Sequence, residues 1–217
     1  AVQKGSFGAC LMKDKKLVRD CLEIMQNGNI EVSMKCRIGL GKELNYDFFE
    51  EFIDEVIKSE IKVVYVHARN AILTGLSPKA NRNIPPLNYN FVKKIKNRFP
   101  NVSFILNGGV DSIDKIINLE KQFDGLMIGR LIQNNPFILR KIDNIFFNKL
   151  NTNFNYEELI SNYFKMISEK IEEDSIFRLL SPLLQIFFGI PNSKTFRIKI
   201  NENMRRHKLD LIENTFL

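Results

Sequence analysis

The sequence predicts an α/β fold in which a parallel sheet is joined by crossover helices and followed by a separate helical segment. Strand-like runs and helical patterns alternate four times between residues 14 and 130, which is the pattern of a parallel sheet. After Pro136 only helical periodicity remains. With 217 residues, of which 44% are hydrophobic, the chain can bury a sizeable core.

The first predicted helix covers residues 14–27 and ends before Gly28. Apolar side chains at helical spacing form its predicted buried face: Leu17, Val18, Cys21, Leu22 and Met25. We therefore expect Cys21 to lie in the core.

The first predicted strand covers residues 30–39, where apolar and polar side chains alternate. Its apolar side is formed by Val32, Met34, Cys36 and Ile38, and its other side by Ser33, Lys35 and Arg37. The remaining elements of this part are expected to be a helix at 47–59, a strand at 62–68, a helix at 89–98, a strand at 102–109, a helix at 112–121 and a strand at 123–130.

The last part of the sequence predicts a helical module. An Asn-rich segment at about residues 148–155 leads to an amphipathic helix at 155–173. A second helix at 176–188 is expected to bend near Pro182, because proline removes a backbone donor. A basic helix is expected to begin around Ser193.

Composition limits the classes of function only in part. The net charge of +7 permits an acidic partner, and amino-acid bias from AT-rich coding explains it equally well. The three cysteines form no CxxC pair, so neither a disulfide framework nor a metal site is predicted. No apolar run is long enough to span a membrane. We expect a cytoplasmic protein without a membrane or metal partner.

Two cations stand on one side of the first strand. If the sheet curves toward closure, Lys35 and Arg37 point into its interior, where a buried charge needs an anion or polar ligand. If the strand lies at a sheet edge, both are simply solvated.

Other polar and glycine residues stand where predicted strands end. They are His67, the run Asn107, Gly108 and Gly109, and the pair Gly129 and Arg130. The carboxyl ends of parallel strands are where ligands bind, and glycine-rich turns there hold phosphate. The alternatives are a structural histidine and ordinary turns.

A long polar segment, residues 68–88, follows the second strand and exceeds the length of a plain connection. Its cations are Arg69, Lys79 and Arg82, accompanied by Thr74, Asn70 and Asn81. This mixture suits contacts to phosphate, sugar or base, whereas the alternative is a solvated loop.

The combination of these motifs resembles the tRNA-dihydrouridine synthases, in particular their A subfamily. The motifs are QKGSFGACLM, MKCRIG, VHARNAILTGLSPKANRNIPPLNY, LNGGV, DGLMIGR and NPF, in the family's order and approximate spacing across residues 1–140. The resemblance implies an FMN-dependent TIM barrel with a helical tRNA-binding domain. It also implies NADPH-linked reduction of the C5=C6 bond of D-loop uridines 20 and 20a.

The resemblance also assigns roles to residues. The cofactor-binding residues would be Lys35, His67, Asn107, Gly108, Gly109, Gly129 and Arg130. The tRNA-binding residues would be Arg37, Arg69, Lys79, Asn81, Arg82, Arg197, Arg205 and Arg206. Residues 1–147 would form the catalytic domain and residues 155–217 the helical domain.

The sequence departs from the family in two places. The family's catalytic cysteine precedes the VQxGxFGA stretch, so we expect it upstream of Ala1, and we expect Cys10 to serve in packing. Four strand–helix units correspond to roughly the C-terminal half of a TIM (β/α)8 barrel. We therefore expect a truncated fragment that is inactive alone and monomeric when full length. In the tail, Phe188 replaces the family's usual histidine.

Two alternative functions remain open. One is an FMN- or phosphate-binding barrel oxidoreductase acting on a small molecule. The other is a non-catalytic tRNA-binding remnant.

Overall fold

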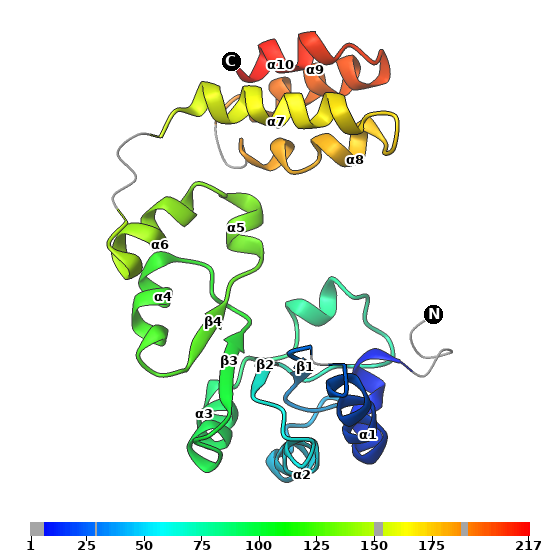
Figure 1. Ribbon diagram of the computed structural model, residues 1–217, viewed down its shortest axis with the longest axis vertical. Helices are drawn as coiled ribbons and strands as arrows, with labels where there is room; N and C mark the ends of the chain where they lie inside the picture. Colours follow the sequence, from blue (N-terminus) through cyan, green and yellow to red (C-terminus); the bar gives the residue numbers. More distant parts are fainter. Residues whose placement is uncertain (1–6, 29, 150–153, 188–190) are drawn as a thin grey trace. The chain divides into compact units, whose positions relative to one another are not determined.

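The computed structural model describes residues 7–28, 30–149, 154–187 and 191–217 (Figure 1). The chain divides into two compact units, Ala1–Gly129 and Arg130–Leu217. This division falls earlier in the chain than residue 147, because helices α5 (Arg130–Asn134) and α6 (Ile138–Phe147) group with the later helices. The predicted functional assignment of the two parts stays a prediction.

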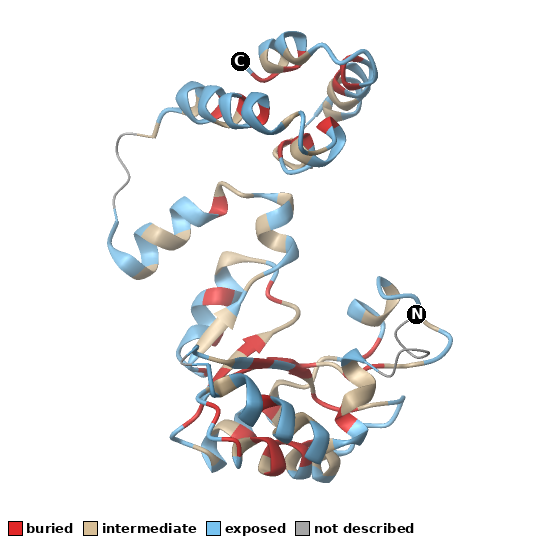
Figure 2. Cartoon of the chain, turned by 45° about the vertical axis from the view of Figure 1, so that its right-hand side comes forward, coloured by how far each residue is buried: buried red, intermediate tan, exposed pale blue. Residues whose placement is uncertain are grey.

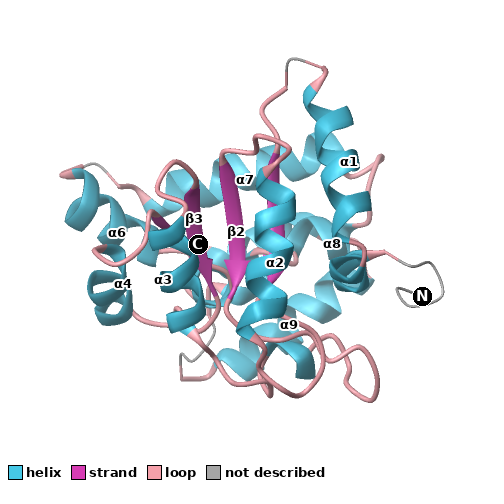
Figure 3. Ribbon diagram, turned by 90° about the horizontal axis from the view of Figure 1, so that it is seen from below, coloured by secondary structure: helices cyan, strands magenta, loops and turns pink. Residues whose placement is uncertain are grey.

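The first unit contains a four-stranded parallel sheet in the order β1-β2-β3-β4. Figure 3 shows its strands in magenta, with β2 and β3 labelled. The strands are β1 (Ser33–Arg37), β2 (Val63–His67), β3 (Ser103–Asn107) and β4 (Gly125–Met127). Arg37 pairs with His67, and His67 pairs with Asn107, at the carboxyl ends of β1 to β3. The predicted parallel sheet and its predicted strands are confirmed.

Four helices connect or precede these strands. They are α1 (Lys15–Gln26), α2 (Tyr46–Ile57), α3 (Tyr89–Arg98) and α4 (Ile113–Glu120). A polar side chain accepts a hydrogen bond from the first turn of each helix: Asp14, Asn45, Asn88 and Ser112. These residue types are the preferred N-caps, so each helix begins where its own sequence specifies.

The core lies between one face of the sheet and the helices α2 and α3 (Figures 1 and 2). On that face, Val64, Val66, Phe104 and Leu106 are fully buried. Their neighbours Val63, Tyr65 and Ile105 alternate with them and are half-buried. The sheet therefore has one apolar face and one more open face, and the open face carries Lys35.

The predicted apolar side of β1 is confirmed at Met34, Cys36 and Ile38, which are buried. By contrast, the prediction that Cys21 packs in the core is wrong, because Cys21 is exposed. Of the predicted buried face of α1, only Leu22 is buried, and Met25 is 59% exposed.

A different side of α1 faces α2. Lys15 and Arg19 form ion pairs with Glu51 and Glu55. Gln26 Nε2 donates to the carbonyl oxygen of Ser59 at 2.6 Å. Residues 15, 19, 22 and 26 share one helical face. These polar contacts turn Cys21 away from the core.

The described residues of the second unit form helices. After α5 and α6 come α7 (Tyr156–Lys170), α8 (Ile176–Leu180), the short η3 (Leu183–Gln185), α9 (Ser193–Arg205) and α10 (Leu209–Phe216). The predicted break at Pro182 is confirmed, since Pro182 separates α8 from η3. Helices α5, α6 and α10 were not predicted from the sequence.

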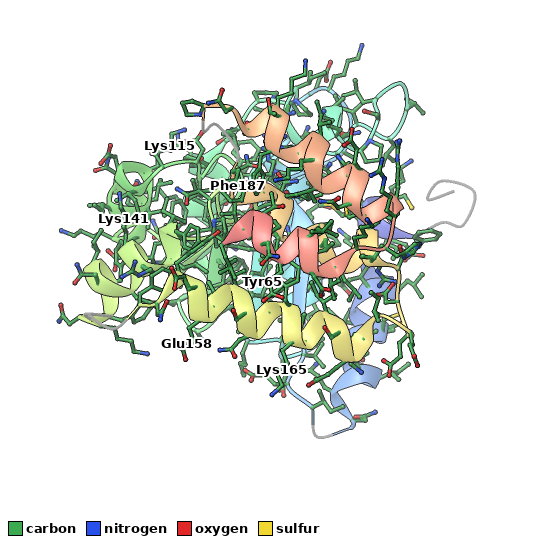
Figure 4. All side chains as sticks on the ribbon, turned by 90° about the horizontal axis from the view of Figure 1, so that it is seen from above. Tyr65, Lys115, Lys141, Glu158, Lys165 and Phe187 are labelled. Carbon is green, nitrogen blue, oxygen red and sulfur yellow. The ribbon has the colours of Figure 1, made fainter. Side chains whose placement is uncertain are left out.

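The later helices share a cluster of buried apolar side chains, among them Ile160, Phe164, Ile200 and Phe216. Phe187 packs against its edge, with its ring centroid 5.5 Å from that of Phe216. Figure 4 labels Phe187, and it labels the exposed Glu158 and Lys165 on the outer side of α7. Within the described residues, no helix is long and apolar enough to cross a membrane.

Candidate functional site

A polar network joins three strands at the carboxyl edge of the sheet. Lys35 Nζ on β1 donates to Asn107 Oδ1 on β3 at 2.9 Å. Asn107 Nδ2 donates to the carbonyl oxygen of Met127 on β4 at 2.8 Å. Partial burial lowers the pKa of Lys35, and the positive charge of Arg37 lowers it further. The structure therefore brings together Lys35 and Asn107, which lie far apart in the sequence.

His67 occupies the middle of this edge. It ends β2, lies between Arg37 and Asn107 in the strand register, and is only 8% exposed. A Cβ atom at Gly108 would lie 2.5 Å from His67 Cδ2. Glycine at position 108 therefore allows the turn after β3 to run directly against the imidazole ring.

The turn Asn107-Gly108-Gly109 requires glycine for reasons within the protein. Both glycines have positive φ, 103° at Gly108 and 72° at Gly109. A Cβ at Gly109 would lie 2.7 Å from the hydroxyl oxygen of Tyr89. That hydroxyl donates to the carbonyl oxygen of Gly108 at 2.8 Å. Tyr89 was not predicted as a site residue from the sequence. The feature that could have indicated it is its position at the end of the NIPPLNY motif.

Gly129 and Arg130 follow β4. Gly129 is exposed, and a Cβ there would meet nothing within 4 Å. Arg130 begins α5 and belongs to the second unit. Their role in cofactor binding stays a prediction.

A pocket of about 380 Å³ lies along β1. It is lined by Gly8 and Met12 of the 3-10 helix η1 (Gly8–Lys13) and by Lys35, Arg37 and His67 of the sheet. Cys36 also lines it, although Cys36 belongs to the apolar side of β1. Side chains from both faces of β1 thus border the pocket, because β1 is the edge strand of the described sheet.

The cysteines differ in environment. Burial raises the pKa of the Cys36 thiol to about 12, so it stays protonated. Cys10 is half-buried, and its Sγ donates to the carbonyl oxygen of Phe7 at 2.9 Å. Among the residues that the structure describes, no three His, Cys, Asp or Glu side chains are grouped to hold a metal ion.

The long loop after β2 is fixed by side chains that we predicted to bind tRNA. Arg37 Nη1 donates to the carbonyl oxygens of Asn70 and Asn81. Arg69 donates to the carbonyl oxygen of Pro85. Lys79 and Arg82 are exposed.

Asn70 holds the base of this loop. It is 1% exposed, and its Nδ2 donates to the carbonyl oxygens of Gly41 and Glu43 at 3.2 and 2.6 Å. A Cβ at Gly39 would lie 2.8 Å from Asn70 Oδ1. The loops after β1 and β2 are therefore packed together as one rim.

The predicted tRNA-binding residues of the tail lie on α9 and directly after it. Arg197 is half-buried on the helix, whereas Arg205 and Arg206 are exposed at its end. Phe188, which we predicted to replace a histidine, lies outside the described residues.

The fold and this polar edge define a parallel β/α protein, a class in which ligands bind at the carboxyl ends of the strands. The family model described as Dihydrouridine synthase (Dus) matches residues 1–216. The chain belongs to the dihydrouridine synthase family.

Three similar curated proteins are each named tRNA-dihydrouridine(20/20a) synthase. The proteins of Shigella flexneri and Escherichia coli K12 are each 35% identical to the chain over 213 residues, which is 97% of the chain. The protein of Shewanella oneidensis is 33% identical over 208 residues, or 95% of the chain. The chain covers 63%, 62% and 62% of the length of these three relatives.

Proposed function

We propose that the protein acts in the NADPH-linked, FMN-dependent reduction of the C5=C6 bond of D-loop uridines 20 and 20a in tRNA. The observation that carries this proposal is the family match across residues 1–216, combined with the grouping of Lys35, His67 and Asn107 at the carboxyl edge. The small-molecule alternative shares the phosphate site but does not require the basic tail.

The residues at the carboxyl edge fit the ring system of FMN. Lys35 offers a positive charge, and the Asn107 amide, which already binds Lys35 and the carbonyl oxygen of Met127, keeps one further N–H donor. His67, next to Asn107 in register, supplies a further ring nitrogen. When bound, FMN would supply the hydride for the uridine, and NADPH would restore the reduced flavin. The chain's own contribution is to orient the ring and to hold positive charge beside it.

The phosphate end of the cofactor would lie at the glycine turn. Gly108, Gly109 and Gly129 allow close approach of a ligand to the backbone. Arg130 would add a positive charge. The glycines of the turn are also needed for packing against His67 and Tyr89, so substitutions there affect both roles.

The basic residues of the rim and tail would meet the RNA. Arg69, Lys79 and Arg82 belong to the rim, and Arg197, Arg205 and Arg206 to the tail. Because positive side chains neutralise phosphates, binding would weaken as salt rises. A flipped-out uridine would be required, since a stacked base cannot present its ring face to the cofactor.

The proton donor for the second carbon of the uridine would be the cysteine that the family carries upstream of the VQxGxFGA stretch. Cys36 is unsuited, because its buried thiol keeps its proton up to a pH of about 12. We also propose a half-barrel arrangement for the first unit, a cytoplasmic location and a monomeric full-length protein.

The test uses the whole open reading frame that encodes these residues. It is expressed in E. coli lacking its own tRNA-dihydrouridine(20/20a) synthase, and tRNA is examined by mass spectrometry. We expect a mass increase of two hydrogens at each of uridines 20 and 20a. Lys35→Met should abolish them, whereas Lys16→Met, at an exposed position of α1, should not.

Folded protein that leaves both uridines unmodified would contradict the proposal. NADPH oxidation with a free metabolite and without tRNA would favour the small-molecule alternative.

A further inference from the structure

Arg37 ties together two distant parts of the long loop. Its Nη1 donates to the carbonyl oxygen of Asn70 at 3.3 Å and to that of Asn81 at 3.0 Å. Asn70 stands near the beginning of the loop, and Asn81 stands in its second half. One guanidinium group on β1 therefore sets the distance between the two arms of the loop.

Asn81 closes the same loop through its side chain. Ile72 N donates to Asn81 Oδ1 at 2.8 Å, and Asn81 Nδ2 donates to the carbonyl oxygen of Ile72 at 2.8 Å. Nδ2 also donates to the carbonyl oxygen of Leu76 at 3.5 Å. A side-chain amide has two N–H donors. Both donors are thus used within the protein, and the half-buried amide has little capacity left for a ligand.

Charge accumulates at the base of this loop. Burial lowers the pKa of Arg37, and the nearby positive charges of Arg69 and Arg82 lower it further. Lys79 directly precedes the short helix η2 (Ala80–Arg82), Arg82 is its last residue, and both side chains are exposed. The half-buried Arg37 therefore binds backbone carbonyls, whereas Lys79 and Arg82 are exposed at the surface of the loop.

We propose that Arg37 and Asn81 are positioning residues that hold the loop in one conformation and contact no RNA phosphate themselves. The phosphate contacts are made by Lys79 and Arg82, whose places on the loop the two residues fix. This inference rests on the proposed function, because it takes RNA as the ligand of the loop.

The first test measures hydrogen exchange in the 217-residue chain. Asn81→Ala removes the acceptor of the Ile72 amide, and Arg37→Met removes the donor to both arms. Both variants should speed exchange of the amides in residues 70–84 by about tenfold, since a typical hydrogen bond is worth about one such factor. Lys79→Met is the matched control and should leave loop exchange unchanged.

The second test measures binding of an unmodified tRNA transcript at several salt concentrations. Arg37→Met and Asn81→Ala should weaken binding at every concentration without changing the salt slope. Lys79→Met should lower the slope by about 0.7–0.9, because it loses one phosphate contact. Arg37→Met and Lys79→Met each remove one positive charge, so the comparison separates positioning from direct contact.

Two results would overturn the inference: unchanged loop exchange in Asn81→Ala, or a slope in Arg37→Met that falls as far as in Lys79→Met. If the wild-type chain binds no tRNA, the role of the loop in RNA binding is contradicted. The exchange measurement then still decides whether Arg37 and Asn81 fix the loop.

Discussion

Gly109 offers a direct test of how tightly the glycine turn packs. Its φ is 72°, and a Cβ there would clash with Leu87 and lie 2.7 Å from the Tyr89 hydroxyl. Gly75, in the long loop, has φ of 80° and nothing within 4 Å of a Cβ. An alanine would be strained by the positive φ at both positions, but only at position 109 would its Cβ meet neighbouring atoms. Gly75→Ala is therefore the matched control for Gly109→Ala.

The magnitudes follow from these two terms. Gly75→Ala should destabilise the chain by about 1 kcal/mol. A residue with a Cβ at positive φ costs about 1–2 kcal/mol, and the lower conformational entropy of the unfolded alanine variant offsets part of this cost. Gly109→Ala should cost about 2–4 kcal/mol, because overpacking adds about 1–3 kcal/mol. Adding Leu87→Ala should recover part of this loss by removing the nearest side chain.

The assay is hydrogen exchange of the amides in β2 and β3. It reports the unfolding of the first unit by itself, whereas the tyrosines of the chain are distributed over both units. Equal losses of stability in Gly109→Ala and Gly75→Ala would refute the packing argument.

Three further predictions concern buried groups. Burial raises the pKa of Cys36 from 9.0 to about 12 in the folded chain, so the unfolded chain loses this proton at lower pH. The free energy of unfolding should therefore fall as the pH rises from 9 to 12. Urea denaturation over this range should show a smaller fall in Cys36→Ala. In native protein a maleimide should label the exposed Cys21 and spare the buried Cys36 until urea is added, as mass spectrometry of peptides would show. Asn70→Ala removes two hydrogen bonds from a residue that is 1% exposed and should cost about 2–3 kcal/mol in urea denaturation; a loss below 1 kcal/mol would contradict its role in the rim.

Local sequence signals determined most elements of the first unit. Helix α3 spans residues 89–98 as predicted, because Asn88 caps it and Val92 and Ile95 form its buried side. Alternation in β1 predicted which side chains face the core, and the carboxyl-end residues of β1 to β3 were identifiable from where each strand stops. Helices α5, α6 and α10 were not predicted.

The partners of polar side chains were decided only by the tertiary structure. Helical spacing placed Cys21 on an apolar face, but Lys15 and Arg19 on another side of α1 are the residues that pair with α2. Cys21 is exposed. Such a choice depends on the neighbouring helix and not on the periodicity of α1 itself.

The sequence by itself determined the family, the parallel sheet and the location of Lys35, His67 and Asn107 at strand ends, because these depend on local patterns and motifs. Only the folded chain decided that Lys35 meets Asn107 and that Arg37 and Asn81 bind backbone carbonyls within the long loop. Hydrogen-bond partners distant in sequence are set by strand register and loop packing. The same arginine can therefore look like an RNA contact in the sequence and hold a loop in the structure.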